Sequence, residues 1–316
     1  MLLTALTWLA VSVTACRAQA TAIRVGHFPN ITHVQALVAH HLTRQGKGWF
    51  EQRLPNVRIE WFVYNAGPSA MEAIFANSLD LAYVGPNPAI NAYAKSRGAE
   101  IRIVAGAVNG GAALVVQPGS QLAGPADFRG KKIGTPQLGN TQDVAARAWL
   151  AAGGLKVTQT GGEAYVLPTA NPDQLGLFKL RQLDAVWTVE PWVSRLEAEA
   201  QGKVLVEETD AVTTVLVSGV KFLAANRELA ARFVTSHGEL TDWIKANPAE
   251  AQRMVNEELT AETRSTLSPE LVARAWKRIV LTSTVSRDAL EKFLANAQSA
   301  GFLRGAPSLS GLIEKP

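Results

Sequence analysis

The chain has 316 residues, of which 47% are hydrophobic and 18% charged, so it holds enough apolar material for a sizeable core and about two domains. The formal net charge is +4, scattered along the chain without a run of Lys or Arg. A nucleic-acid-binding protein would show a basic stripe interleaved with aromatic residues, so this composition argues against that class of partner.

The first twenty residues carry a pattern typical of an export signal. Residues 2–15 are apolar but too few to span a bilayer, and small residues precede Cys16. This ending resembles a bacterial lipobox, which implies cleavage before Cys16, acylation of its sulfur and tethering outside the cytoplasmic membrane. The alternative is ordinary cleavage after residues 18–20, which discards Cys16. Because Cys16 is the only cysteine, we expect no disulfide, thiolate metal site or cysteine nucleophile in the mature chain.

From residue 22 onward, strand and helix patterns alternate. The first series has predicted strands at 23–28, 57–65, 80–85 and 101–108, and predicted helices at 32–54, 69–78 and 88–96. The second series has predicted strands at 112–117, 131–136, 164–169, 184–190 and 203–208, and predicted helices at 141–154, 172–183 and 191–201. Such alternation predicts an α/β protein built from βαβ units, with parallel sheets covered on both faces.

The C-terminal third is predicted to be almost entirely helical after a segment at 213–219. Its predicted helices lie at 227–246, 248–258, 269–280 and 287–300. We expect these helices to pack on the first α/β unit, because no strand-rich unit remains for them to form alone. The predicted division is therefore residues 1–20 as the signal region, 21–109 plus 215–316 as lobe 1, and 110–214 as lobe 2. Two chain crossings between lobes favour a cleft with hinge closure.

Small polar residues follow several predicted strands of the first lobe. Asn30 and His33 lie in the loop after the first strand, Gly67 and Ser69 follow the second, and Gly85 and Asn87 follow the third. Helix N-termini carry unpaired N–H groups and about half a positive charge, so they bind anions without a cationic side chain. Each of these segments alone also fits an ordinary turn between a strand and a helix, since Gly, Pro and Ser are common in such turns. Their predicted convergence on one cleft favours a binding site.

The second lobe offers matching positions. Asn140, Thr141 and Gln142 begin a predicted helix, and we expect either Asn140 or Thr141 to cap it and the other to remain available to a ligand. Glu190 ends a strand just before Pro191 and needs a partner there: a ligand amine, a base from the other lobe, or solvent. Trp192 fits a cleft wall or the core equally well.

The histidines do not predict a metal site. His33 falls in the first turn of a helix, where a hydrogen-bonded or solvated role is more usual than a ligand role. His40 and His41 are adjacent and so point to different faces of a helix, which prevents both from holding one ion. The remaining spacing matches no zinc site. We therefore expect no metal and no cofactor.

Taken in order, five segments resemble the substrate-binding proteins of ABC importers, closest to the nitrate/sulfonate/taurine (aliphatic sulfonate-binding) family. They are "IRVGHFPNITH", "NAGPSAMEAI", "DLAYVGPNPAINAYAK", "GKKIGTPQLGNTQDVAARAWL" and "DAVWTVEPWVSRL". The resemblance implies the type II periplasmic binding protein fold, in which two α/β lobes close over a ligand. It also implies a periplasmic or membrane-tethered monomer that delivers a small anion or zwitterion to ABC permease subunits. The positions it assigns to the ligand site are Asn30, His33, Gly67, Ser69, Gly85, Asn87, Asn140, Thr141, Gln142, Glu190 and Trp192.

The resemblance leaves the solute and two other functions open. Glu190 would repel a simple anion in a buried site, so a zwitterion such as taurine, with its ammonium on Glu190, is one solution beside an alkanesulfonate or nitrate. Desulfinases and thiamine-pyrimidine synthases resemble this architecture too, but both rely on a cysteine that the mature chain lacks. An extracellular sensor that binds a solute without transporting it is the third possibility.

Overall fold

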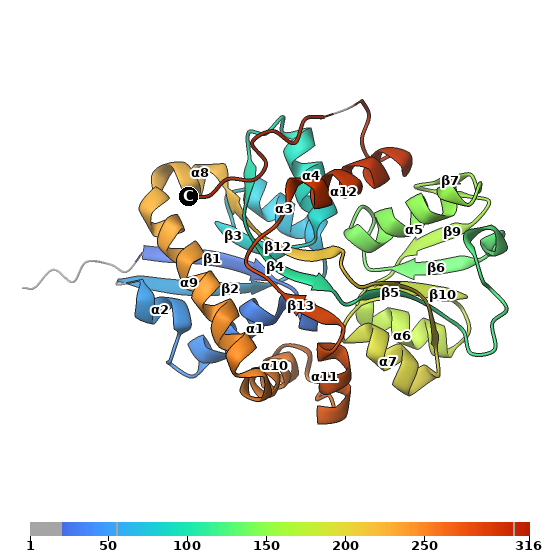
Figure 1. Ribbon diagram of the computed structural model, residues 1–316, viewed down its shortest axis with the longest axis horizontal. Helices are drawn as coiled ribbons and strands as arrows, with labels where there is room; N and C mark the ends of the chain where they lie inside the picture. The colour runs from blue at the N-terminus through green and yellow to red at the C-terminus, as the bar shows by residue number, and fades with distance from the viewer. Residues whose placement is uncertain (1–20, 55, 306) are drawn as a thin grey trace, which may run out of the picture.

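The computed structural model describes residues 21–54, 56–305 and 307–316, and two β-sheets organise them (Figure 1). The first sheet has the order β13-β4-β12-β3-β1-β2, and the second has the order β11-β5-β10-β6-β9. The strands of the first sheet are β1 (Thr21–His27), β2 (Val57–Val63), β3 (Leu81–Val84), β4 (Ile101–Gly110), β12 (Val212–Gly219) and β13 (Ile279–Leu281). Those of the second are β5 (Ala112–Val116), β6 (Lys132–Thr135), β9 (Tyr165–Pro168), β10 (Ala185–Val189) and β11 (Lys203–Glu208). A separate two-stranded pair is formed by β7 (Val157–Thr158) and β8 (Gly161–Gly162).

The chain passes from the first sheet to the second between β4 and β5 and returns between β11 and β12. We call the part built on each sheet a lobe. This mixed α/β arrangement is the predicted fold class. The residue boundaries proposed for the lobes stay predictions.

The sheets are mixed, so the prediction of parallel sheets was wrong for the strands beside each crossing. β1 runs parallel to β2 and β3, and β6 runs parallel to β9 and β10. In contrast, β12 is antiparallel to β3 and β4, and β5 is antiparallel to β10 and β11. β12 and β5 enter their sheet directly from the other lobe, without the helical crossover that a parallel connection requires. β13 is also antiparallel to β4 and follows α11 within the first lobe.

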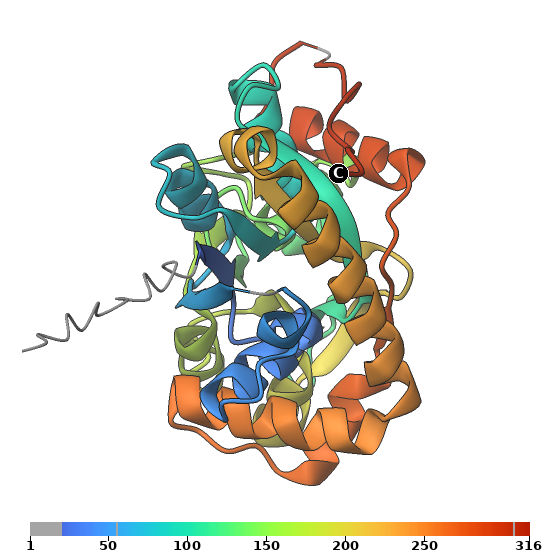
Figure 2. The ribbon, with the colours of Figure 1, turned by 90° about the vertical axis from the view of Figure 1, so that its left-hand side faces the viewer.

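Helices cover both faces of the first sheet, with one apolar core on each side. One core includes residues of α1 (Val34–Arg44), α2 (Trp49–Arg53), α8 (Val220–Ala225), α9 (Arg227–Ala246), α10 (Pro248–Thr263) and α11 (Pro269–Trp276). The other includes residues of α3 (Gly67–Phe75), α4 (Pro86–Lys95) and α12 (Arg287–Ser299). Figure 2 shows α10 in orange and α12 in red at opposite ends of the view. Stacked rings of Phe50 and Phe233, with centroids 4.0 Å apart, join α2 to α9 in the first core.

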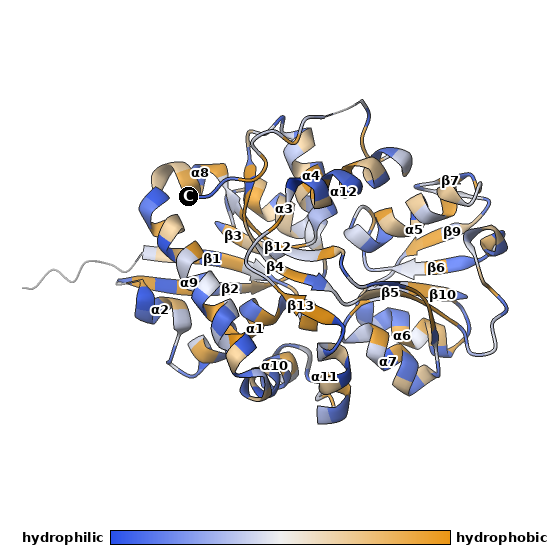
Figure 3. Cartoon of the chain, in the orientation of Figure 1, coloured by the Kyte–Doolittle hydropathy of each residue, from blue (hydrophilic) through white to orange (hydrophobic). Residues whose placement is uncertain are grey.

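The second sheet is enclosed in the same way. α5 (Thr141–Ala152) and the 3-10 helix η2 (Pro125–Phe128) pack on one face, while α6 (Asn171–Lys179) and α7 (Trp192–Ala200) pack on the other. In Figure 3 the strands carry much of the hydrophobic colour, and outer helices such as α12 carry hydrophilic colour. Burial on both faces explains why the central strands β5 and β10 read as near-continuous apolar runs.

The C-terminal third differs from its prediction in three places. The helix predicted over 269–280 ends at Trp276, because the β-branched pair Ile279–Val280 enters β13 and pairs with β4. α10 continues past the predicted end at residue 258 to Thr263. The short helix α8 was not predicted. Within the described residues, no helix is both long and apolar enough to cross a membrane.

Candidate functional site

A small cavity of about 30 Å³ lies between the lobes, where loops at the strand ends lead into helices. Seven of the predicted site residues line it: Asn30, His33, Gly67, Gly85, Asn140, Thr141 and Gln142. The lining includes residues in the first turns of α3, α5 and α6, and one residue directly before α4. The positive ends of two helix dipoles from each lobe therefore face a common space.

The two lobes touch beside this cavity. The backbone N–H of Asn87 in α4 donates to Oγ1 of Thr141 in α5, at 3.4 Å. Asn65 Nδ2 donates to the carbonyl of Pro136 across the same gap, at 3.3 Å. These contacts describe an arrangement in which the lobes are closed on each other.

Asn140 caps α5, as expected for one of the first two residues of that segment. Its Oδ1 accepts the backbone N–H of Asp143 at 2.8 Å, and its Nδ2 donates to Oε1 of Gln142 at 3.1 Å. A buried ion pair between Asp143 and Arg147, 3.0 Å apart, fixes the same turn, and Gly139 N–H also donates to Asp143. The start of α5 is thus held rigidly without using the side-chain NH₂ group of Gln142.

Two amide side chains of the cavity, those of Asn30 and Gln142, have their acceptor atoms engaged inside the protein. Asn30 Oδ1 accepts from Trp192 Nε1 at 2.9 Å and from Asn171 Nδ2 at 3.3 Å. Gln142 Oε1 accepts from Asn140. The side-chain NH₂ groups of Asn30 and Gln142 have no hydrogen-bond partner among the described residues, so donors are what remain for a ligand.

His33 contributes another donor. Its Nδ1 accepts the backbone N–H of Phe28 at 3.4 Å, and burial holds the pKa of the ring well below its ordinary value. The neutral ring must then carry its proton on Nε2. His33 is therefore an uncharged donor in the wall of the cavity, beside the ring of Phe28 at a centroid distance of 4.4 Å.

The described lining residues include no Lys, Arg, Asp or Glu. The rest of the wall includes the amide residues Asn65 and Asn171, hydroxylic residues, and apolar members at Phe28, Ala66, Pro88, Pro136 and Val189. A space with helix N-termini and neutral N–H donors, and without a carboxylate, is suited to a compact anion.

Four predicted site residues lie outside the cavity lining, and each has an internal partner. Ser69 Oγ donates to the carbonyl of Ala66 at 2.9 Å, and Asn87 Nδ2 donates to the carbonyl of Phe293 in α12 at 3.0 Å. Trp192 positions Asn30 through its indole N–H and does not form a wall. The structure does not bring the Ser69 and Asn87 side chains into the cavity, because Ala66 and Phe293 satisfy them, and of the two places considered for Trp192 it shows the buried one.

Glu190 is the fourth. Its carboxylate accepts from the backbone N–H and the hydroxyl of Ser194, at 3.1 and 2.9 Å, and from Arg278 Nη1 at 3.1 Å. Burial raises the pKa of Glu190, against the opposing effects of Ser194 and Arg278. Of the three kinds of partner expected for Glu190, the structure shows a base from the other lobe, Arg278. Glu190 therefore does not face the cavity and does not oppose an anion there.

Sequence reasoning missed Asn171 as a lining residue. It precedes Pro172 at the start of α6, directly after a strand, and so repeats the pattern that identified Gly67 and Gly85. Thr32 also lines the cavity, in the loop that supplies Asn30 and His33, and Thr213 lines it from β12, a segment without such a signal. His40 and His41 do face different partners, as expected: His40 lies beside Glu262, and His41 lies beside Glu257.

Known proteins share this architecture. The NMT1-like family matches residues 17–257, more than half of the chain. An Escherichia coli (strain K12) protein named for binding aliphatic sulfonates is 26% identical over 271 residues, 84% of this chain and 79% of that protein.

Two solved structures illustrate the shared fold. The alkanesulfonate-binding protein SsuA from Xanthomonas axonopodis pv. citri, bound to MOPS, superposes with a TM-score of 0.76 at 21% identity, covering 95% of this chain and 100% of that one. The periplasmic nitrate-binding protein NrtA from Synechocystis PCC 6803 gives 0.74 at 14% identity, covering 91% and 83%. These likenesses show the type II periplasmic binding protein fold.

Proposed function

Because the chain belongs to the NMT1-like family, we propose that it is the solute-binding component of an ABC importer. It captures a small anion between its two lobes outside the cytoplasm and delivers it to membrane permease subunits. The named relatives that bind sulfonates or nitrate support a solute-binding role.

The observation that best supports an anionic solute is the set of hydrogen-bond donors in the cavity. Within the described residues, the side-chain NH₂ groups of Asn30 and Gln142 and the Nε2–H of His33 have no hydrogen-bond partner, while their acceptor atoms are used internally. Four helices direct their N-terminal ends at the same space. A cationic or acceptor-poor solute would find no counterpart among these groups.

The size of the cavity favours a compact headgroup. About 30 Å³ is room for two or three water-sized groups, roughly the extent of a nitrate ion or a sulfonate headgroup. A taurine ammonium has no carboxylate to meet, because Glu190 is paired with Arg278 outside the lining. We therefore favour nitrate or a short alkanesulfonate over a zwitterion.

Titration calorimetry with nitrate, methanesulfonate, octanesulfonate, taurine and choline tests this proposal. We expect micromolar binding, about −8 kcal/mol, for nitrate or methanesulfonate. We expect weaker heats for octanesulfonate and taurine, and none for choline. Null heats for every anion, or tightest binding of choline, would overturn the proposal.

We further propose that the protein has no catalytic activity. The cysteine on which the enzyme alternatives rely has no counterpart after Cys16. Incubation with an arylsulfinate and detection of released sulfite tests this, and turnover by the purified protein would restore the enzyme alternative.

The proposed location is the outer face of the cytoplasmic membrane or the periplasm, with Cys16 as the lipid anchor. Cys16 lies outside the described residues. Mass spectrometry of the protein from its native membrane distinguishes acylated Cys16 from cleavage after residues 18–20. Uptake of the solute after reconstitution with its permease distinguishes an importer from a sensor. Light scattering tests whether the protein is a monomer, as proposed.

A further inference from the structure

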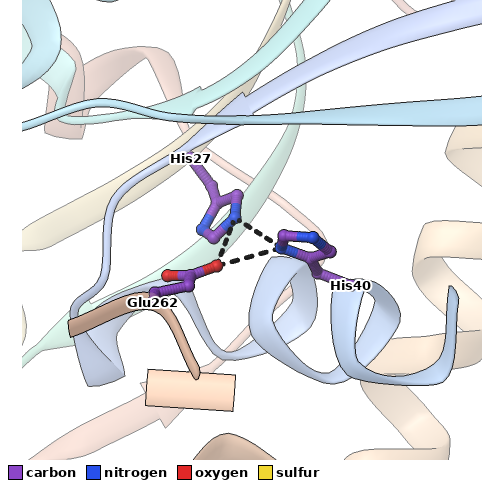
Figure 4. A group of neighbouring side chains, drawn as sticks. All are labelled: His27, His40 and Glu262. Atoms are coloured by element: carbon purple, nitrogen blue, oxygen red, sulfur yellow. Dashed lines mark hydrogen bonds and ion pairs between the residues drawn. The ribbon is translucent and has the colours of Figure 1, made fainter. Parts of the chain in front are cut away.

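Two histidines and a glutamate from distant segments meet inside the first lobe. His27 ends β1, His40 lies on α1, and Glu262 lies in the last turn of α10 (Figure 4). The His27 Nε2 atom lies 3.2 Å from His40 Nδ1 and 3.0 Å from Glu262 Oε1, and His40 Nδ1 lies 2.9 Å from the same Oε1. The imidazoles and the carboxylate are almost wholly buried. Three metal-ligating atoms therefore converge on one point that the anion cavity does not use.

The two ring nitrogens of His27 have different partners. Its Nδ1 lies 3.3 Å from the carbonyl oxygen of Phe28, which only accepts, so Nδ1 donates to it. Its Nε2 faces a carboxylate oxygen and a second imidazole nitrogen. Such a contact is repulsive unless a cation or an extra proton lies between the atoms. A histidine whose outer N–H donates to a backbone carbonyl is the usual arrangement of a metal ligand.

The spacing of the three atoms fits a tetrahedral ion. Bonds of about 2.0–2.1 Å in tetrahedral geometry place ligand atoms about 3.3 Å apart. The observed 2.9–3.2 Å is within a few tenths of an ångström of that value. Two imidazole nitrogens favour Zn²⁺ or a related transition metal over Ca²⁺ and Mg²⁺, which prefer all-oxygen sites.

A second carboxylate, that of Glu258, lies beside the cluster. Glu258 Oε1 lies 2.9 Å from His40 Nδ1 and also accepts from Arg44 Nε at 2.8 Å. Two carboxylates against one guanidinium leave an excess negative charge in a buried place. Glu262 Oε2 is buried without a hydrogen-bond partner in the described part of the chain. Both features suit a bound cation.

We propose that His27, His40 and Glu262 bind a Zn²⁺ ion, with the Glu258 carboxylate beside His40. The ion ties β1, α1 and α10 together. It also lies behind the cavity wall, because Phe28 links the outer nitrogen of His27 to His33 through its carbonyl and its N–H. This inference reverses the expectation of no metal and does not depend on which solute the cavity binds.

Metal titration of the whole protein, prepared without a polyhistidine tag and stripped with a chelator, tests the site. We expect one Zn²⁺ per chain by calorimetry and elemental analysis, and a visible absorption band when Co²⁺ replaces it. The isosteric Glu262→Gln and the substitutions His27→Gln and His40→Asn should each weaken binding by about 100-fold or more. Circular dichroism establishes that each variant is folded, and Glu262→Gln serves if a histidine variant is not.

His41→Asn is the matched control, because His41 is adjacent to His40 on α1 but faces Glu257 and Gln45. It should bind Zn²⁺ as the unchanged protein does. If the stripped protein takes up neither Zn²⁺ nor Co²⁺ at micromolar concentration, the cluster is a proton-bridged ion pair and the proposal is wrong. Undiminished binding by the Glu262→Gln or His40→Asn protein would overturn it as well.

Discussion

Arg278 of the first lobe forms an ion pair with Glu190 of the second, with 3.1 Å between Nη1 and Oε1. Arg278 lies between α11 and β13, and Glu190 follows β10. The same guanidinium contacts Glu197 at 2.9 Å and Glu207 at 3.0 Å, so one cation joins three carboxylates of the other lobe. Of these, Glu190 is the fully buried one. Its charge depends on Arg278 and on the hydrogen bonds from Ser194.

We predict that Arg278→Ala lowers the free energy of unfolding by about 2–4 kcal/mol, because it leaves the Glu190 carboxylate buried without a cation. Urea unfolding followed by circular dichroism measures the loss. Adding Glu190→Gln to the Arg278→Ala protein should recover most of it, since the neutral amide removes the unpaired charge.

Arg274→Ala is the matched control for this prediction. Arg274 lies on α11 at 4.0 Å from Glu197, and its side chain is about half exposed. Its loss should change the free energy of unfolding by less than about 1 kcal/mol. Equal effects of the two arginine substitutions would show that the buried pair has no special role.

The Glu190–Arg278 pair shows where sequence reasoning stopped. The position of Glu190 at a strand end was readable, and so was its need for a partner. Its partner lies 88 residues further along the chain, in a segment predicted as helix, so no local pattern connects the two. The metal-ligating cluster was missed for the same reason. Glu262 lies beyond the predicted end of α10, and His27 is in a strand.

The cavity residues were easier to predict because a local rule places them. Asn140, Gly67 and Gly85 each begin or precede a helix after a strand, and the ends of neighbouring strands meet at one edge of a sheet. The rule gives the position of a residue but not the direction of its side chain. Ser69 and Asn87 obey it and still bond to their own surroundings. The antiparallel strands β5 and β12 were unpredictable from periodicity, which is the same for either direction of a buried strand.

A second prediction concerns the side-chain NH₂ group of Gln142. Gln142→Ala should weaken binding of the anion by about 1–3 kcal/mol, which is the range for one lost hydrogen bond in a buried site. Gln142→Glu keeps the shape but places a negative charge beside the ligand, and should abolish detectable binding. Calorimetry with the anion that binds the unchanged protein most tightly measures both effects.

Ser69→Ala provides the control, because the Ser69 hydroxyl is engaged with Ala66. The affinity of the Ser69→Ala protein for the anion should remain within about two-fold of that of the unchanged protein, a difference of about 0.4 kcal/mol. Loss of binding in the Ser69→Ala protein together with normal binding by Gln142→Glu would place the anion elsewhere.

A third prediction separates closure of the lobes from folding. A Cβ added at Gly85 would overlap with Oγ1 of Thr141, which belongs to the opposite lobe. Gly85→Ala should therefore weaken solute binding by about ten-fold or more, because it disfavours the closed state. The free energy of unfolding should hardly change, since the overlap disappears when the lobes separate. Small-angle scattering with saturating anion should show a larger radius of gyration than for the unchanged protein.

Gly176→Ala is its control, because a Cβ at that position on α6 meets nothing within 4 Å. This variant should bind the anion normally. Its free energy of unfolding should rise by about 0.5–1 kcal/mol, because the unfolded chain with alanine has less backbone entropy to lose on folding. A Gly85→Ala protein that binds and closes as well as the Gly176→Ala protein would show that the Thr141 contact does not limit closure.

The last prediction concerns acid stability and His237, which is buried in the first lobe. Its Nε2 lies 2.8 Å from the carbonyl of Gly106, and its Nδ1 lies 2.9 Å from the hydroxyl of Tyr83, so the neutral ring donates to Gly106 and accepts from Tyr83. Burial lowers the pKa of His237 from 6.5 to about 4, although the bond to Gly106 opposes the shift. Between these two values the unfolded chain binds a proton that the folded chain does not, so stability is full above pH 6.5 and falls as the pH approaches 4.

The expected loss from His237 is about 3 kcal/mol between pH 7 and pH 4, at about 1.4 kcal/mol for each unit of pKa shift. Urea unfolding at pH 7, 6, 5 and 4 measures it against a His237→Gln variant, whose amide still donates to Gly106 but does not titrate. The variant is expected to be less stable at pH 7 and to lose less stability on acidification, so the two curves approach each other as the pH falls. Because the other titrating groups are shared, the difference between the curves isolates His237. Curves that stay parallel from pH 7 to pH 4 would mean that His237 keeps an ordinary pKa in the folded protein.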